Sequence, residues 1–236
     1  MPTKTQADAL ARVWRMLRDT GDSATAQLLT DTEIIEVITD SLLTYSLSRP
    51  RLVTFDLTAS GTETQTLPTT QNGWVDDFSA IKLIETPTGS NPPNYIDPRK
   101  YALYRSPTGQ TLRWLIESPA TGTTVRVTFT GTHIYGAQAA NTTAPDVDFG
   151  AICALSASLA ATAISSGFAR THEPLISADG ASYRTKSMEW ASVAKAWREV
   201  YEKHMASVRR PASGAVNWDT RMGGGYAHLT HDRWRR

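Results

Sequence analysis

The chain has 236 residues, of which 40% are hydrophobic and 20% charged, proportions typical of a folded globular protein of one large or two small domains. Its formal net charge of +1 gives no overall attraction to nucleic acid or acidic lipid. The single cysteine, Cys153, excludes an intramolecular disulfide and a thiolate metal cluster. Because the N-terminal stretch has no apolar run, we expect no signal peptide and a protein made in a cytoplasm, kept or assembled there.

Two helices are expected before the first strand. The first covers residues 4–19, and its apolar stripe consists of Leu10, Val13, Trp14 and Leu17. The second covers residues 31–46, where Thr30 and Glu33 have the spacing of a capping box. Pro50 then ends the helical region, because proline does not continue a helix.

Residues 52–135 are rich in Thr, Pro and Gly and contain short alternating runs. The expected strands are residues 52–57, 62–67, 80–85, 101–105, 112–117 and 123–130. Ser106–Gly109 is a good turn sequence, so the fourth and fifth strands are predicted to form a hairpin. The last strand would point Val125, Val127 and Phe129 inward. The set predicts a small antiparallel sandwich or partly open barrel, with Trp74 and Phe78 filling its core.

Residues 145–167 are predicted to form one long buried helix. Apolar residues recur at helical spacing, and most other positions are Ala or Ser; the recurring residues are Ile152, Leu155, Leu159 and Ala163. Small side chains on all faces predict neighbouring helices on more than one side. A membrane span is the alternative, but we expect the hydropathy of so Ala- and Ser-rich a segment to be too low.

The ends of this central helix are also predicted. Thr143 is the expected N-cap, followed by Pro145 in the first turn. Asp146 and Asp148 would lie at the positive end of the helix dipole. Gly167 is the expected terminator, because glycine readily adopts the left-handed conformation that ends a helix.

The last helix is expected over residues 183–208, with apolar or aromatic positions three or four residues apart: Trp190, Ala194, Trp197, Val200, Tyr201, His204 and Met205. The predicted fold class is therefore α+β, a four-helix bundle of two N-terminal and two C-terminal helices with an inserted antiparallel β domain. The expected parts are residues 1–50, 51–136 and 137–208, followed by an extended arm, residues 209–236. The two ends of the insertion must then lie close together.

The C-terminal segment, residues 209–236, contains six arginines and two aspartates, so it carries +4 while the rest of the chain carries −3. Three consecutive glycines oppose a helix there, yet aromatic residues are spaced along it. Trp, Tyr and Arg are enriched at interface hot spots, so we expect an arm that orders on a partner. The candidate partner-binding residues are Arg209, Arg210, Trp218, Arg221, Tyr226, Arg233, Trp234 and Arg235. The alternatives are a tail folded on its own bundle and a nucleic-acid-binding arm.

No residue pattern predicts a catalytic site, a metal or a cofactor. His228 and His231 have the spacing of two metal ligands but no cysteine partner, so a structural or accidental role is favoured. His204 is expected to be hydrogen bonded inside the bundle, and Asp76 and Asp77 to be turn residues. The chain contains neither a nucleophile elbow nor a P-loop, and we expect no enzymatic activity.

Three stretches of the chain resemble the head–tail adaptor (connector) proteins of long-tailed bacteriophages. Residues 42–51, LLTYSLSRPR, resemble their helix-to-strand junction. Residues 73–85, with the proline-rich residues 87–98, resemble their β insertion. Residues 125–130, followed by the Ala-rich helix, resemble the return into the bundle. The similarity spans about residues 8–205, although the smaller, helical-only members of the family lack so large a β insertion.

This resemblance implies a virion neck protein, assembled in the host cytoplasm without membrane contact. It implies a ring of neighbouring copies, commonly about twelve, beneath the portal protein. DNA would pass through the ring, tail or neck proteins would bind below, and the C-terminal arm would dock on the portal. One alternative is a tail-completion or baseplate component whose β domain binds a partner or glycan. Another is an enzyme or nucleic-acid-binding protein with the tail as its lid or arm.

Overall fold

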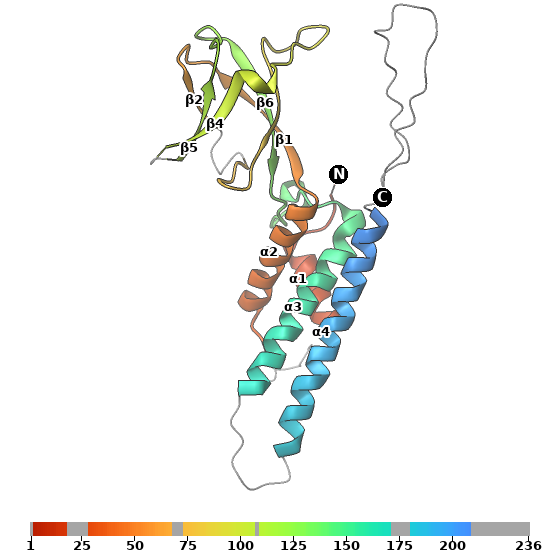
Figure 1. Ribbon diagram of the computed structural model, residues 1–236. Helices are drawn as coiled ribbons and strands as arrows, with labels where there is room; N and C mark the ends of the chain where they lie inside the picture. Colours follow the sequence, from red (N-terminus) through yellow and green to blue (C-terminus); the bar gives the residue numbers. More distant parts are fainter. Residues whose placement is uncertain (1, 18–27, 68–72, 107–108, 171–179, 209–236) are drawn as a thin grey trace, which may run out of the picture.

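The computed structural model describes residues 2–17, 28–67, 73–106, 109–170 and 180–208. The described helices form an elongated bundle, and the strands form a separate unit at one end of it (Figure 1). The α+β class predicted from the sequence, a helical bundle joined to a β domain, is therefore confirmed.

Among the residues that the structure describes, four helices make up the bundle: α1 (Gln6–Leu17), α2 (Asp31–Ser48), α3 (Phe149–Arg170) and α4 (Gly180–Val208). The other three all pack against α3, and Figure 1 shows α3 lying between α2 and α4. The prediction that the Ala-rich segment is the buried central helix is confirmed.

Small side chains on α3 allow this close packing. Ala154, Ala157 and Ala160 have no exposed surface. Ser158 Oγ donates a hydrogen bond of 2.7 Å to the carbonyl oxygen of Ala194 on α4, so the two backbones lie only a short side chain apart. Because an Ala or Ser side chain fills little space, bulkier residues here would push α4 away.

The predicted ends of α3 are wrong. A 3₁₀ turn, η4 (Asp146–Asp148), precedes the helix, which begins at Phe149 because Pro145 keeps an extended backbone. Thr143 does not cap it, since its Oγ1 accepts a hydrogen bond from the backbone N–H of Ile134 instead. The helix continues through Gly167 to Arg170, because a helical glycine does not terminate a helix whose neighbouring residues pack against α4.

The α3 segment is more apolar than the sequence interpretation allowed. An 18-residue window within residues 146–170 has a mean hydropathy of 1.7, which reaches that of a membrane span, so the expectation of too low a value is wrong. However, 67% of the apolar window is buried inside the protein. A central helix covered by other helices satisfies the same length and composition.

The remaining helices largely follow their patterns. The capping box of α2 is confirmed, since Glu33 N–H donates to Thr30 Oγ1 at 3.3 Å and Thr30 N–H donates to Glu33 Oε2 at 2.7 Å. The α2 helix runs two residues beyond the predicted end, and α1 begins at Gln6 rather than at residue 4. Val200 of α4 belongs to the predicted apolar series but is 46% exposed, because it lines an open groove between α1 and α4.

In the described residues, six strands form two three-stranded antiparallel sheets: β1 (Arg51–Thr58), β2 (Thr64–Thr66), β3 (Ile81–Glu85), β4 (Tyr101–Ser106), β5 (Gly109–Trp114) and β6 (Thr124–Gly131). The strand orders are β1-β6-β3 and β2-β5-β4. Residues of both sheets meet in one core, which includes the predicted inward residues Val125, Val127 and Phe129. The β4–β5 hairpin is confirmed, but β5 ends at Trp114 rather than residue 117.

Of the two aromatic residues expected in the β core, only Trp74 is there. Its ring lies 5.1 Å from that of Phe129, centroid to centroid, and it is 3% exposed. Phe78 is half-buried and does not belong to this core. In the short turn after Trp74, Asp77 has a positive φ of 65°, so the direction of the chain changes sharply just before Phe78.

The two ends of the β domain lie side by side, as expected. Arg51, the first residue of β1, is paired with Gly131, the last residue of β6. A Cβ on Gly131 would lie 2.9 Å from the carbonyl oxygen of Gly73, so only glycine fits this approach without a shift. The backbone N–H of His133 then donates to Ser46 Oγ of α2 at 2.8 Å. Both connections to the bundle are thereby held together.

The packing of α3 predicts that Ala157→Leu destabilises the protein by about 1–3 kcal/mol through overpacking. Chemical denaturation followed by circular dichroism measures the change. Ala163→Leu is the matched control, because Ala163 is exposed on the same helix and tolerates a larger side chain. Equal unfolding free energies for the two variants would contradict the central packing of α3.

Candidate functional site

The centre of the junction is the carboxylate of Asp148, which is completely buried. The hydroxyl of Tyr45 donates to its Oδ2 at 2.6 Å, and Arg49 Nη1 donates to the same oxygen at 2.7 Å. His204 Nε2 donates to Oδ1 at 2.7 Å. The residues come from the end of α2, the link to β1, the turn η4 directly before α3, and the last turns of α4. We call Asp148 and these three donors the junction cluster.

The junction cluster keeps Asp148 ionised. Burial raises the pKa of Asp148, but hydrogen bonds from His204 and Tyr45 and the positive charge of Arg49 lower it more, and the pKa lies below its ordinary value. Burial and the hydrogen bond to Asp148 also raise the pKa of Tyr45, so its hydroxyl stays a donor. A buried carboxylate that loses one of these donors is left incompletely paired, which is costly.

His133 forms a second tie beside the junction cluster. Its Nδ1 lies 2.9 Å from the carbonyl oxygen of Thr143, and its Nε2 lies 3.1 Å from that of Arg49. The ring also packs on Tyr45 at 5.2 Å between centroids. Burial lowers the pKa of His133 more than the two carbonyl oxygens raise it. A neutral ring carries one N–H, so it donates to one of these two carbonyl oxygens, and this bond and the contact with Tyr45 hold the return from β6 beside the end of α2.

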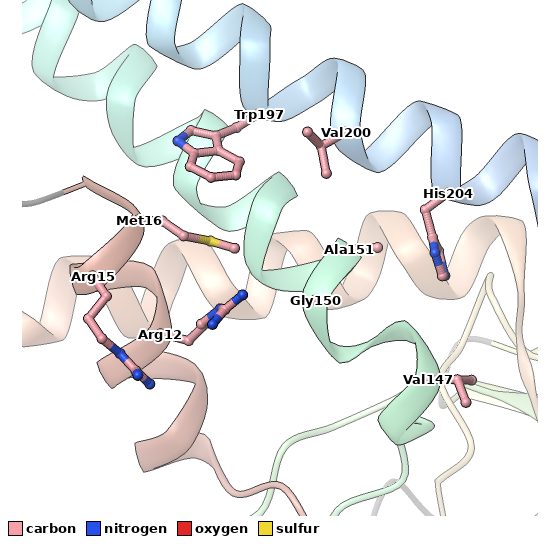
Figure 2. A pocket seen from close by; sticks show the side chains of 9 residues that line it. All are labelled: Arg12, Arg15, Met16, Val147, Gly150, Ala151, Trp197, Val200 and His204. Carbon is pink, nitrogen blue, oxygen red and sulfur yellow. The ribbon is translucent and has the colours of Figure 1, made fainter.

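An open groove with a volume of about 510 Å³ lies on the bundle next to His204 (Figure 2). One wall is α1, the other is α4, and the start of α3 forms the floor. The groove is lined by Arg12, Arg15, Met16, Val147, Gly150, Ala151, Trp197, Val200 and His204. Val147 is 75% exposed, and both arginines are exposed. The groove thus joins apolar surface to positive charge.

These two features differ in what they can do. The junction cluster is buried and its carboxylate already accepts three hydrogen bonds, so it holds elements together. The groove is open and can receive another molecule. Among the described residues, no group of three or more His, Cys, Asp or Glu side chains could hold a metal ion.

The predicted site residues fall into two groups. The candidate arm residues from Arg209 to Arg235 lie outside the described residues, as do His228 and His231. Of the residues within the structure, His204 is hydrogen bonded inside the bundle as predicted. Asp76 and Asp77 occupy a turn as predicted, where Asp76 accepts from the indole of Trp74 and Asp77 pairs with Arg105.

Sequence reasoning missed the central role of Asp148. The pattern assigned it to the helix dipole, together with Asp146, whose carboxylate instead accepts hydrogen bonds from the backbone and hydroxyl of Thr3. The available signal was the set of polar residues on otherwise apolar stretches, Tyr45 on α2 and His204 on α4. Such residues need a buried partner, and Asp148 supplies it.

The geometry predicts that Asp148→Asn destabilises the protein by about 2–3 kcal/mol, because an amide group faces the donors with a donor of its own. The expected loss of unfolding free energy is not larger, because the Arg49 side chain is 43% exposed and water can solvate its charge when the carboxylate is removed. Denaturant unfolding measures it. Asp40→Asn is the control on an exposed helix face, with an expected change within about 0.5 kcal/mol. A loss of unfolding free energy no larger than that of Asp40→Asn would contradict the stabilising role of the junction cluster.

The lowered pKa of Asp148 also predicts a pH dependence. The folded carboxyl has the lower pKa, so its contribution is complete above the unfolded value of about 3.9 and is lost as pH falls through the folded value. The difference in unfolding free energy between the wild type and Asp148→Asn should therefore be constant near neutrality and shrink below about pH 4. A difference that is unchanged down to about pH 2 would show that folding does not lower the pKa of Asp148.

No protein-family model and no curated protein matches the chain. Among solved structures, the chain is similar to a chain of the neck of an empty gene transfer agent (GTA) particle computed with C6 symmetry. The identity is 15%, the alignment covers 84% of this chain and 92% of the other, and the TM-score is 0.32. It is also similar to a chain of the virion of a native GTA particle, at 16% identity, 80% and 88% coverage and a TM-score of 0.30. TM-scores of this size do not establish a shared fold or a family.

Proposed function

We propose that this protein is a structural, non-catalytic subunit of the neck of a phage-like virion, a head–tail adaptor that forms a ring beneath the portal. The junction cluster carries the proposal. Residues 42–51, which resemble the helix-to-strand junction of adaptors, contain Tyr45 and Arg49, two of the three donors to Asp148. The stretch that bears the resemblance is thus the stretch that fixes the β domain to the bundle.

A rigid junction suits a subunit between head and tail. The β domain leaves and re-enters the bundle through the paired residues Arg51 and Gly131, and His133 and the junction cluster hold both connections. In a ring subunit built this way, a force on the β domain is transmitted to the helical bundle, because the connection between them is not a flexible hinge. In this proposal residues 51–136 are the β domain and residues 1–50 with 137–208 are the bundle.

The partners follow from the same proposal. Neighbouring copies close a ring of about twelve subunits around DNA, a tail or neck protein binds below, and residues 209–236 dock on the portal. The α4 helix ends at Val208, at the end of the bundle that carries the β domain (Figure 1). An arm from this point starts beside the junction. The particle neck is the proposed location, with assembly in the host cytoplasm.

A second candidate function is a tail-completion or baseplate component. The β domain exposes several large apolar side chains, which favours a binding role for it. Leu115 and Ile116 are 53% and 73% exposed after β5, and Tyr95 is 55% exposed. In this alternative the β domain, rather than residues 209–236, recognises a protein partner or glycan.

The adaptor proposal predicts that the full chain joins the portal ring encoded by the same genome in a fixed, symmetric stoichiometry, measured by light scattering. Deleting residues 209–236 should abolish this binding while leaving the circular dichroism spectrum and melting temperature unchanged, because the deletion removes none of the described core.

Equal binding by the truncated chain would disprove the role of the arm. A full chain that ignores the portal would support the tail or baseplate alternative, for which glycan binding by the β domain is the next measurement. Binding to DNA that weakens steeply with salt and is lost in the truncated chain would favour a nucleic-acid-binding arm.

A further inference from the structure

The outer face of α2 carries a stripe of exposed residues that the other described parts of the chain leave uncovered. Glu36, Asp40, Leu43 and Leu47 follow one another at spacings of three or four, so they share one face of the helix. Leu43 is 48% exposed and Leu47 is 70% exposed. Within the described part of the chain, no Lys, Arg or His forms an ion pair with Glu36 or Asp40. We call these four residues the acidic stripe.

The groove between α1 and α4 has the opposite character. Arg12 and Arg15 lie one turn apart on α1, and Arg15 Nε donates to the backbone of its own helix at Ala11. In the described ranges no carboxylate pairs with either arginine. Beside them lie the exposed side chains of Val147 and Val200. The groove thus combines two positive charges with apolar side chains, and the acidic stripe combines two negative charges with two leucines, so the two surfaces are complementary.

The groove and the acidic stripe lie on opposite sides of the bundle. Figure 2 looks into the groove, where α1 and α4 flank α3, and the pale ribbon of α2 runs behind α3. Because Ser41, Leu42 and Tyr45 of α2 are buried in the bundle, the acidic stripe faces away from α3. Two complementary surfaces on opposite sides of one subunit make a head-to-tail contact, which repeats into a ring when the rotation closes.

We infer that the acidic stripe of one copy docks in the groove of the next copy, so that Glu36 and Asp40 face Arg12 and Arg15. This inference rests on the proposed ring and names the surface that builds it. Residues 209–236 of the same chain are a poorer occupant, because their charge of +4 would be repelled by the two arginines. DNA is also a poorer occupant, since the exposed valines match leucines better than phosphates.

Charge reversal tests the contact in both directions. One variant carries Arg12→Glu and Arg15→Glu, and the other carries Glu36→Arg and Asp40→Arg. All four side chains are exposed, so both variants should fold, as circular dichroism will show. Light scattering, at high concentration and with the portal ring, should find that neither variant assembles alone, because like charges meet. Their equal mixture should assemble, since each acidic surface then meets a basic one.

A disulfide test locates the contact. Leu43→Cys and Val200→Cys, placed in separate chains and mixed under oxidation, should form an interchain disulfide. Cys153 is 1% exposed and should not react. The control pair is Ile116→Cys with Val200→Cys, where Ile116 is 73% exposed on the β domain. For the charge-reversal test the control is Glu117→Arg, because Glu117 is also exposed on the β domain, away from both surfaces, and its reversal should leave assembly unchanged.

The outcomes separate this inference from the proposed function. Assembly restored in the mixture, with the Leu43–Val200 pair linked above the control, supports the contact. Assembly that survives both charge reversals, or is not restored by mixing, overturns the contact while portal binding by the wild type leaves the adaptor proposal standing. A wild type that neither associates nor joins the portal overturns both.

Discussion

The fold depends on one buried charge. Asp148 contributes no surface to solvent, and its carboxylate is stabilised by Tyr45, Arg49 and His204 together. The hydrophobic effect is non-directional and tolerates small displacements of helices, whereas a buried carboxylate requires its donors within hydrogen-bond distance. The cluster therefore fixes how the end of α2 and the last turns of α4 meet the start of α3. Since Arg49 lies in the link to β1, the same carboxylate also orients the β domain.

The second constraint is the small cross-section of α3. The hydroxyl of Ser158 reaches the backbone of α4 only because the neighbouring positions of α3 carry small residues, Ala or Ser. The small side chains of α3 therefore allow α1, α2 and α4 all to pack closely against it. Because α2 and α4 then occupy different sides of α3, the outer face of α2 and the flank of α4 remain uncovered. The exposed leucines of α2 and the exposed Val200 of α4 are consequences of this arrangement.

Local signals in the sequence predicted much of the fold. The capping box at Thr30, the alternation of Val125, Val127 and Phe129, and the Ala-rich centre all depend on neighbours a few residues away, and all were confirmed. The junction cluster depends on residues 103, 99 and 56 positions from Asp148, so no local pattern contains it. Its aspartate also had a sufficient local explanation in the helix dipole. Gly167 failed as a terminator because packing along α4 outweighs the weak preference of glycine.

The pairing of Arg51 with Gly131 has an evolutionary consequence. The bundle contacts the insertion through two adjacent antiparallel chain segments, so the bundle constrains only the base of the β domain and not its length. Segments inserted between such neighbouring points add little chain entropy cost to the parent fold. Strands beyond the base could be lengthened, replaced or reduced to a short hairpin while the same helices still pack around Asp148. The bundle and the β domain are thus free to diversify at different rates, one under the constraint of packing and the other under that of whatever it contacts.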